Sequence, residues 1–255
     1  MTDQPTAAML VIGDEILSGR TRDSNANLLA QTMTELGVQL VEIRMIPDDH
    51  DTIVASVNAL REKADYVFTS GGIGPTHDDI TADGVAAAFG VPIGVRDDAR
   101  AILEREYAKR NMEVNEARLR MARIPDGAKL IDNPVSHAPG FILGNVHVMA
   151  GVPAIFGAML EGLKPGIQGG PPVLSHSFRC HIGEGDLAGP LGAVQKRFPD
   201  VSMGSYPFGG GAGAMLVLRH ADRALLAAAA DALRSALEPL GGAESETPPQ
   251  AAGAT

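Results

Sequence analysis

The chain has 255 residues, enough for one or two domains with a full hydrophobic core. Its formal net charge of −10 disfavours binding to nucleic-acid backbones, and its one cysteine, Cys180, rules out an intrachain disulfide and fits a reducing cytoplasm. The apolar run 7–12 is too short to span a membrane and lacks the basic flank of a signal peptide, so we expect neither.

Strands and helices alternate along the first part of the chain. The expected strands are 7–12, 38–46, 66–69, 128–131, 140–143 and 146–149. The expected helices begin near Ser24 and Asp49, cover about 82–89 and 97–109, and include a last one ending near Leu163. This alternation indicates an α/β domain with parallel strands joined by right-handed crossovers.

The pattern changes after a Pro- and Gly-rich stretch at 164–172, which is the best candidate for a linker. We therefore expect a first domain over 1–168 and a small, KH-like α+β domain over 173–240. The glycine run 209–213 fits either a hairpin turn or a KH-type loop, and the hairpin is favoured. The tail 241–255 is rich in Gly, Pro, Ala and Glu and is predicted to be disordered.

The loop that follows the strand 66–69 carries the most information about function. Its sequence is Ser70-Gly71-Gly72-Ile73-Gly74-Pro75-Thr76-His77-Asp78-Asp79-Ile80-Thr81. Three glycines allow backbone N–H groups to converge on an anion, and the helix that follows adds partial positive charge. In an open α/β sheet, ligands bind in the crevice outside the carboxyl ends of the strands. The loop is therefore predicted to bind a small phosphorylated ligand.

Two neighbouring carboxylates, Asp78 and Asp79, follow the glycines directly. Beside a phosphate they would repel the ligand unless they hold a divalent cation such as Mg²⁺ or a proton. We predict that they are catalytic residues and metal ligands. The alternative is that Asp79 or Thr81 caps the next helix while Asp78 is only solvated.

Asp14 and Glu15 leave the first strand at the same edge of the sheet and are candidate ligand- or metal-binding residues. Asn25 either caps its helix or donates a hydrogen bond to the ligand, and both interpretations stay open. The candidate ligand-binding set is completed by residues of the loop: Ser70, Gly71, Gly72, Gly74, Pro75 and Thr76.

The segments 13–19 and 23–25 together with the loop 70–81 resemble the molybdopterin-binding domain superfamily. The branch that they resemble most is the N-terminal part of competence/damage-inducible protein A, and the segments 133–134 and 138–141 are also similar to that branch. The resemblance covers about 7–165. It implies a three-layer α/β/α domain of the MoaB/Mog type with a mostly parallel sheet.

The resemblance also implies a function. The competence-protein branch implies a metal-dependent pyrophosphatase that acts on dinucleotides such as ADP-ribose. In the wider superfamily the implied function is the binding or adenylylation of molybdopterin, and a non-catalytic ligand-binding protein is a third alternative. In the adenylyltransferases, an acidic residue near the end of the second strand takes part in metal-assisted chemistry. The matching residue here is Asp48, which the resemblance implies to be catalytic and whose alternative role is to cap the next helix. Relatives imply a homo-oligomer, a dimer or trimer. The amidohydrolase activity of longer members is not carried over, because the matching domain does not occur in this sequence.

Overall fold

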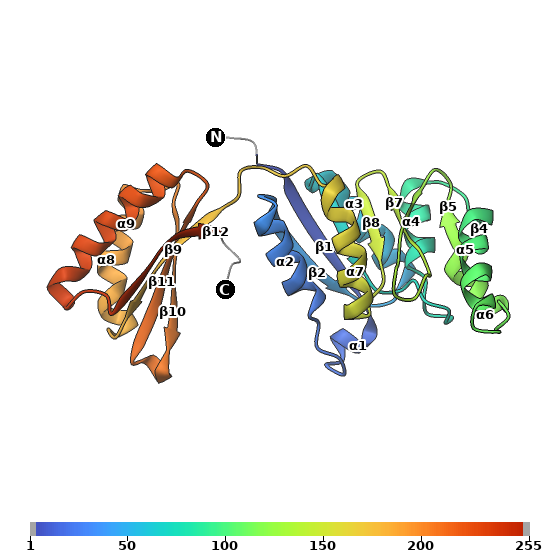
Figure 1. The fold of residues 1–255 in the computed structure, drawn as a ribbon, viewed down its shortest axis with the longest axis horizontal. Helices are drawn as coiled ribbons and strands as arrows, with labels where there is room; N and C mark the ends of the chain where they lie inside the picture. Colours follow the sequence, from blue (N-terminus) through green and yellow to red (C-terminus); the bar gives the residue numbers. More distant parts are fainter. Residues whose placement is uncertain (1–3, 252–255) are drawn as a thin grey trace. The chain divides into compact units, whose positions relative to one another are not determined.

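The structure, a computed structural model, describes residues 4–251, and the chain divides into two compact units between Gly170 and Pro171. Each unit is described by itself (Figure 1). Within the described residues, no helix is long and apolar enough to cross a membrane.

The first unit is built on a six-stranded sheet with the strand order β2-β1-β3-β8-β7-β6. The first four strands in this order run parallel, and β7 and β6 extend the sheet in antiparallel fashion. The elements are β1 (Thr6–Ile12), α1 (Asp14–Leu17), α2 (Asn25–Glu35), β2 (Gln39–Ile46), α3 (His50–Lys63), β3 (Tyr66–Ser70), α4 (Thr81–Phe89), β4 (Ile93–Val95), α5 (Asp97–Ala108), α6 (Glu116–Leu119), β5 (Arg123–Pro125), β6 (Lys129–Ile131), β7 (Gly140–Leu143), β8 (Val146–Met149) and α7 (Pro153–Leu163).

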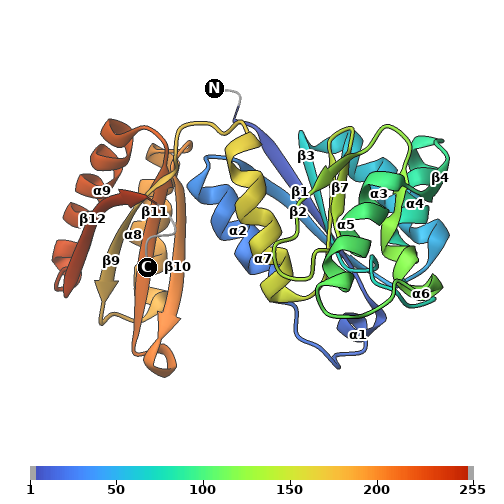
Figure 2. The same cartoon turned by 45° about the vertical axis from the view of Figure 1, so that its right-hand side comes forward.

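Strand β1 is buried on both of its faces, which is why its sequence is a continuous apolar run. Its even-numbered side chains from Ala8 to Ile12 pack in a core with α3, α4 and α5. Its odd-numbered side chains from Ala7 to Val11 pack in a second core with α2 and α7, and Figure 2 shows these two helices side by side on one face of the sheet. The predicted three-layer α/β/α fold with a mostly parallel sheet is confirmed.

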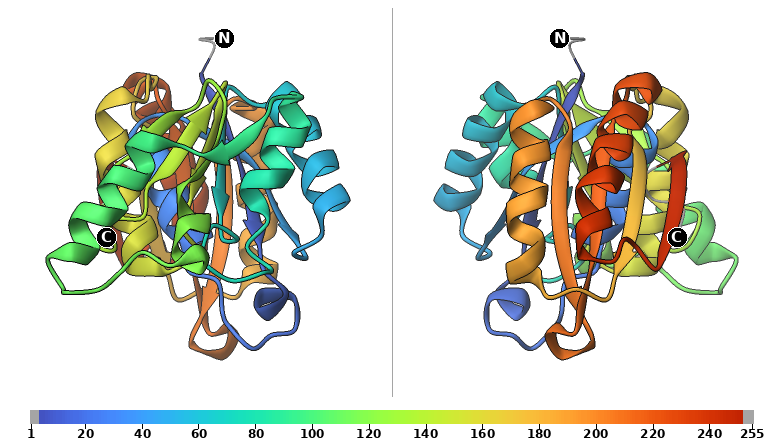
Figure 3. Two further views of the ribbon diagram at one scale, coloured as in Figure 1. Left: turned by 90° about the vertical axis from the view of Figure 1, so that its right-hand side faces the viewer. Right: turned by 90° about the vertical axis from the view of Figure 1, so that its left-hand side faces the viewer.

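The second unit is a four-stranded antiparallel sheet with the order β10-β11-β9-β12. Its elements are β9 (Leu174–Cys180), α8 (Glu184–Arg197), β10 (Ser202–Phe208), β11 (Gly213–His220), α9 (Arg223–Leu237) and β12 (Ser245–Ala251). Both helices cover one face of the sheet (Figure 3). The βαββαβ order is that of a ferredoxin-like split βαβ unit, not the KH-like domain that we expected. The glycine run 209–213 connects β10 to β11 as a hairpin turn.

The prediction of a disordered tail is wrong for Ser245–Ala251, and 252–255 lie outside the described residues. This segment forms β12, an edge strand antiparallel to β9. The register shifts between Thr247 and Gln250, where two prolines intervene. Proline is tolerated on an edge strand because its missing N–H can fall on the unpaired side, so composition alone does not exclude a strand here.

A cluster of Glu246, Arg234 and His176 connects β12 to α9 and β9. Glu246 accepts hydrogen bonds from Arg234 of α9, at 2.9 Å from Nε and 2.5 Å from Nη2. The Nε2 atom of His176, a buried residue of β9, lies 2.5 Å from the same carboxylate. The hydrogen bonds from Arg234, and then that from His176, lower the pKa of Glu246 below its ordinary value of 4.5.

We predict that Glu246→Gln lowers the free energy of unfolding of the second unit by about 1 kcal/mol, because a charge-assisted pair is lost. The carboxylate stabilises the fold above its ordinary pKa of 4.5, and this contribution is lost as the pH falls through the lowered pKa. Urea denaturation across this acid range should therefore give a steeper loss of stability for the wild type than for the variant.

The matched control is Asp200→Asn, since the Asp200 side chain makes no hydrogen bond or ion pair to any described residue. This variant should follow the wild type. Coincident acid limbs for the wild type and Glu246→Gln would contradict the role given to this cluster.

Candidate functional site

The candidate site lies at the carboxyl ends of β1 and β3, where the order of the parallel strands reverses. From β1 the chain crosses to β2 on one side, and from β2 it returns to β3 on the other. Crevices at such switch points are the usual ligand sites of open α/β sheets. A cavity of about 490 Å³ opens here, within the size range of small-molecule pockets.

Four segments form the walls of the cavity. The loop after β1 supplies Ile12, Gly13 and Glu15, the glycine loop supplies 71–75, 78 and 79, the segment after β8 supplies 150–153, and the loop after β6 supplies Asn133, Ser136 and Ala138. Thr21, Asp48, Met121 and Ile155 complete the lining. Of the predicted residues, Asp14, Asn25, Ser70 and Thr76 do not line the cavity.

The glycine loop leaves β3 in a conformation that requires glycine at two positions. Gly71 has φ +107°, and a Cβ there would collide with the carbonyl oxygen of Ile12 at the end of β1. Gly72 has φ +66°, and its Cβ would collide with the Thr81 hydroxyl. That hydroxyl donates to the Gly71 carbonyl at 3.0 Å. The first turn of α4 is thereby joined directly to the start of the loop.

The same loop presents unpaired backbone donors. Among residues 4–251, no acceptor pairs with the N–H groups of Gly72, Ile73 or Gly74, and all three residues line the cavity. On another wall of the cavity, α7 begins with Pro153 after the segment 150–152, so the positive end of a helix also borders the space. Free N–H groups and a helix N-terminus together favour an anionic ligand.

Asp78 and Asp79 have different surroundings. Asp79 Oδ2 accepts hydrogen bonds from Thr76, at 2.8 Å from N and 2.5 Å from Oγ1, and so closes the turn of the loop. Asp78 is exposed at the rim, and its pKa is lowered, first by the Thr76 hydroxyl. Neither Asp79 nor Thr81 caps α4, because its N-cap is Ile80 with no side-chain bond, so the capping alternative is wrong.

An acidic edge borders the cavity on the side of β1 and β2. The Asp48 carboxylate accepts the N–H of Asp14 at 3.0 Å, whereas the cap of α3 is Asp49. Burial is the main cause that raises the pKa of Asp48. The neighbouring charges of Asp14, Glu15 and Asp78 raise it further.

The donor set of this edge suits a hard divalent cation, which prefers carboxylate oxygens. In the part of the chain that the structure describes, however, no three His, Cys, Asp or Glu side chains converge closely enough to hold a metal ion as they stand. Asp48, Glu15 and Asp78 all line the cavity, while one oxygen of Asp79 is already engaged by Thr76.

Asn25 neither caps α2 nor reaches the cavity. The N-cap of the helix is Ser24, and Asn25 is buried. Its Nδ2 donates to Ser70 Oγ at 2.8 Å and to the Gly151 carbonyl at 2.7 Å. Asn25 therefore holds the end of β3 next to the segment that follows β8, which places both walls of the cavity.

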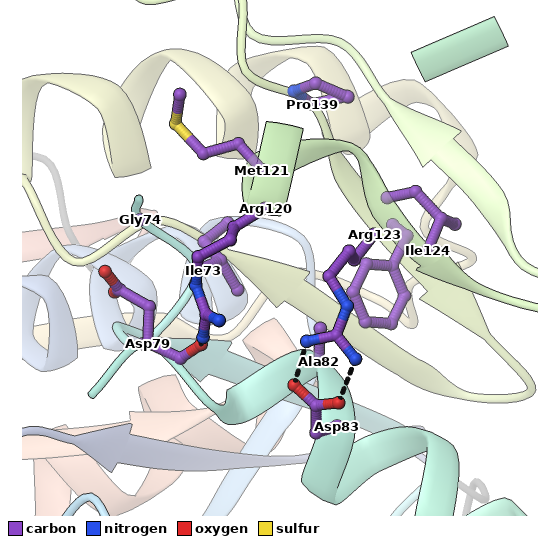
Figure 4. A pocket seen from close by; sticks show the side chains of 12 residues that line it. Ile73, Gly74, Asp79, Ala82, Asp83, Arg120, Met121, Arg123, Ile124 and Pro139 are labelled. Carbon is purple, nitrogen blue, oxygen red and sulfur yellow. Dashed lines mark hydrogen bonds and ion pairs between the residues drawn. The ribbon is translucent and has the colours of Figure 1, made fainter. Parts of the chain in front are cut away.

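Sequence reasoning missed two groups of residues at the site. Arg120 follows α6 and donates to the carbonyl oxygens of Thr76 at 3.1 Å and of Asp79 at 3.3 Å, so it clamps the loop from outside. Figure 4 shows Arg120 beside Asp79 in a small adjoining pocket, which also contains the Arg123–Asp83 ion pair. No motif of the sequence indicates this long-range contact.

The second group is the loop after β6. The buried side chain of Asn133 donates to Ser136 Oγ and to the Ala138 carbonyl, at 2.6 and 2.8 Å. It also accepts the N–H groups of Val135 and Ser136. These bonds make one wall of the cavity rigid. The segments 133–134 and 138–141, which resemble the competence-protein branch, were the signal for this region in the sequence.

Comparisons with known proteins agree with this division into two units. Residues 8–169 match the family described as "Probable molybdopterin binding domain", and 172–242 match the middle domain of FAD synthase. A protein of Aeropyrum pernix is 35% identical across 96% of this chain and 98% of its own length. A CinA-like protein of Myxococcus xanthus is 36% identical over 60% of this chain, which corresponds to 38% of that longer protein.

A solved structure is also similar. The crystal structure of CinA from Thermoplasma acidophilum, a protein described as having unknown function, superposes with a TM-score of 0.59 at 34% identity. The superposition covers 63% of this chain and 98% of the other.

We predict that Arg120→Gln loosens the loop 74–79 without unfolding the sheet, because two hydrogen bonds to loop carbonyls are lost. Amide hydrogen exchange of the loop should accelerate about five- to thirtyfold, since each of the two bonds contributes on the order of 1 kcal/mol. Arg110→Gln is the charge-matched control, as no described residue bonds to its guanidinium. Unchanged exchange in Arg120→Gln would show that the clamp does not order the loop.

We also predict that Gly72→Ala destabilises the first unit by about 1–2 kcal/mol, because alanine is strained at positive φ and its Cβ meets Thr81. The control is Gly94→Ala, at a position in β4 outside the left-handed region and with no atom within 4 Å of the added Cβ. Chemical denaturation of both variants measures the difference, and equal stabilities would contradict the close approach.

Proposed function

The chain belongs to the molybdopterin-binding domain family and is CinA-like, and we propose that its cavity binds a phosphorylated pterin or nucleotide. We propose further that it hydrolyses the pyrophosphate bond of a dinucleotide such as ADP-ribose with the help of a divalent cation. The observation that carries the proposal is the pairing of two chemistries in one cavity: free backbone N–H groups on the glycine loop, and carboxylates on the neighbouring edge.

The backbone donors account for the binding of phosphate. The N–H groups of Gly72 to Gly74 and the N-terminus of α7 attract phosphate oxygens without adding a mobile charge. The apolar residues Met121, Val152 and Ile155 also line the cavity and suit the ring of a pterin or a nucleobase.

The carboxylates account for the choice of a hydrolytic reaction. Asp48, Glu15 and Asp78 would otherwise repel a phosphate, and together they would hold a divalent cation. Such a cation, when bound, would neutralise the charge that develops on the phosphoryl oxygens.

The remaining step needs only water and this chain's own groups. A water molecule attacks one phosphorus atom, the bond from that phosphorus to the bridging oxygen breaks, and two phosphomonoesters result. The proton released by the attacking water passes to the solvent, since the carboxylates of the cavity would be occupied by the cation. Asp79 and Arg120 keep the loop in place and stay outside the reaction.

The test is AMP release from ADP-ribose, FAD or NAD in the presence of Mg²⁺, Mn²⁺ or Co²⁺. We predict activity for the wild type and a loss of at least about a hundredfold in kcat for Asp78→Asn, in line with the several kcal/mol that metal-assisted charge stabilisation contributes. Asp126→Asn is the control, because the exposed Asp126 side chain bonds to no described residue and does not line the cavity.

Each other outcome has a meaning. Equal AMP release from the wild type and Asp78→Asn would remove Asp78 from the reaction. Transfer of AMP from added ATP to molybdopterin, with release of pyrophosphate, in place of hydrolysis would assign the adenylyltransferase chemistry of the family. Tight ligand binding without turnover under any metal would leave a binding protein.

A further inference from the structure

The cavity of the first unit has no cationic side chain in its walls. The carboxylates that line it belong to Glu15, Asp48, Asp78 and Asp79. Among residues 4–251, no lysine or arginine lines it. One divalent cation would balance only half of this negative charge. The backbone N–H groups of the glycine loop can hold one phosphate, but a ligand with a second phosphate would meet an excess of like charge.

The arginines beside the glycine loop are already engaged. Arg120 donates to the carbonyl oxygens of Thr76 and Asp79. Arg123 forms an ion pair with Asp83 at 2.5 Å. Both arginines line the small adjoining pocket and not the cavity itself (Figure 4). A ligand in the cavity would have to break these bonds before it could use either guanidinium.

Two free arginines flank another residue of the cavity wall. The loop that joins α1 to α2 contributes Thr21 to the lining, and Arg20 and Arg22 are its neighbours in the chain. Both arginines are exposed, and neither side chain makes a hydrogen bond or ion pair to any described residue. Figure 1 shows this loop next to α1, beyond the end of β1. The border of the cavity therefore carries unpaired positive charge.

The backbone of this loop is tied on both sides of the arginines. The N–H of Thr21 donates to the carbonyl oxygen of Glu15 at 2.9 Å. Further along, Asp23 Oδ2 accepts the N–H of Ala26, in the first turn of α2, at 3.0 Å. These bonds hold the loop beside Glu15, which lines the acidic edge of the cavity. The long side chains of the two arginines stay free to turn toward a ligand.

The chemistry of the guanidinium group selects the kind of ligand. Its planar fork of N–H donors matches two oxygens of one phosphate, and its positive charge makes these hydrogen bonds stronger than those of a neutral donor. The glycine loop supplies neutral backbone donors, which suffice for one phosphate. Positive charge is needed most where a second phosphate comes close to the carboxylates of the cavity.

We propose that Arg20 and Arg22 bind the second phosphate of the ligand while the N–H groups of Gly72 to Gly74 hold the first. The two arginines thereby make the cavity selective for a ligand with a pyrophosphate group over a nucleoside monophosphate. This inference rests on the proposed function, because it assigns the second half of the same site.

The test compares the binding of α,β-methylene-ADP and AMP to the full chain in the presence of Mg²⁺, by isothermal titration calorimetry. The methylene bridge cannot be hydrolysed, so the dissociation constant is measured without turnover. A double variant, Arg20→Gln with Arg22→Gln, should bind α,β-methylene-ADP at least about tenfold more weakly than the wild type, because charge-assisted hydrogen bonds are lost. Its affinity for AMP should stay within about twofold of the wild type, since AMP has no second phosphate.

Two further variants separate the role of the arginines from effects of net charge and of folding. The control, Arg110→Gln with Lys129→Gln, removes the same charge from exposed side chains that bond to no described residue and do not line the cavity. It should bind both ligands as the wild type does. Arg20→Lys with Arg22→Lys keeps the charge without the fork and should recover part of the affinity for α,β-methylene-ADP. Circular dichroism confirms that each variant is folded.

Equal losses of affinity for α,β-methylene-ADP and AMP in the glutamine double variant would overturn the proposal, as would wild-type binding of both. Failure of the proposed hydrolysis has a different signature. If the selective loss is found but the wild type releases no AMP from ADP-ribose, the role of the arginines is supported and the hydrolytic reaction is removed. A wild type that binds neither ligand overturns both.

Discussion

The close approach of two strand ends underlies the whole candidate site. Gly71, directly after β3, passes so near the carbonyl oxygen of Ile12 at the end of β1 that a side chain cannot fit between them. Because the strands are neighbours and parallel, their following loops leave the sheet at the same edge. The loop with the free N–H groups and the loop with Glu15 are therefore forced to share one cavity.

Several interactions then stabilise this arrangement without taking part in ligand contact. Thr81 joins α4 to Gly71, Asn25 joins β3 to Gly151, and Asp79 closes the turn around Thr76. These side chains make their hydrogen bonds to other groups of the protein. The exposed Asp78 and the half-buried Asp48 face the cavity, and burial, followed by the repulsion of neighbouring carboxylates, raises the pKa of Asp48. The residues that hold the scaffold are thus different from the carboxylates that face the cavity.

The second unit shows how a charged cluster can determine the extent of a domain. Without β12, β9 would be an open edge of the sheet in this unit. The pairing of Glu246 with Arg234 and His176 anchors β12 across that edge. This segment has the composition of a disordered tail, yet it forms a strand because β9 offers an open edge and Arg234 and His176 bind its carboxylate. These partners are distant in sequence, so composition does not reveal them.

By itself, the sequence determined the features that depend on local patterns. The apolar run of β1, the alternation of strands and helices and the Gly-Gly-Ile-Gly loop sufficed to predict the α/β/α fold and the position of the loop, since side-chain periodicity and glycine conformation act over a few residues. Only the tertiary structure decided what depends on long-range contacts. It turned Asp79 toward Thr76, brought Arg120 to the loop, placed Asn25 between two walls and recruited β12. Each of these outcomes depends on which distant backbone group comes within hydrogen-bonding range, and no local pattern carries that information.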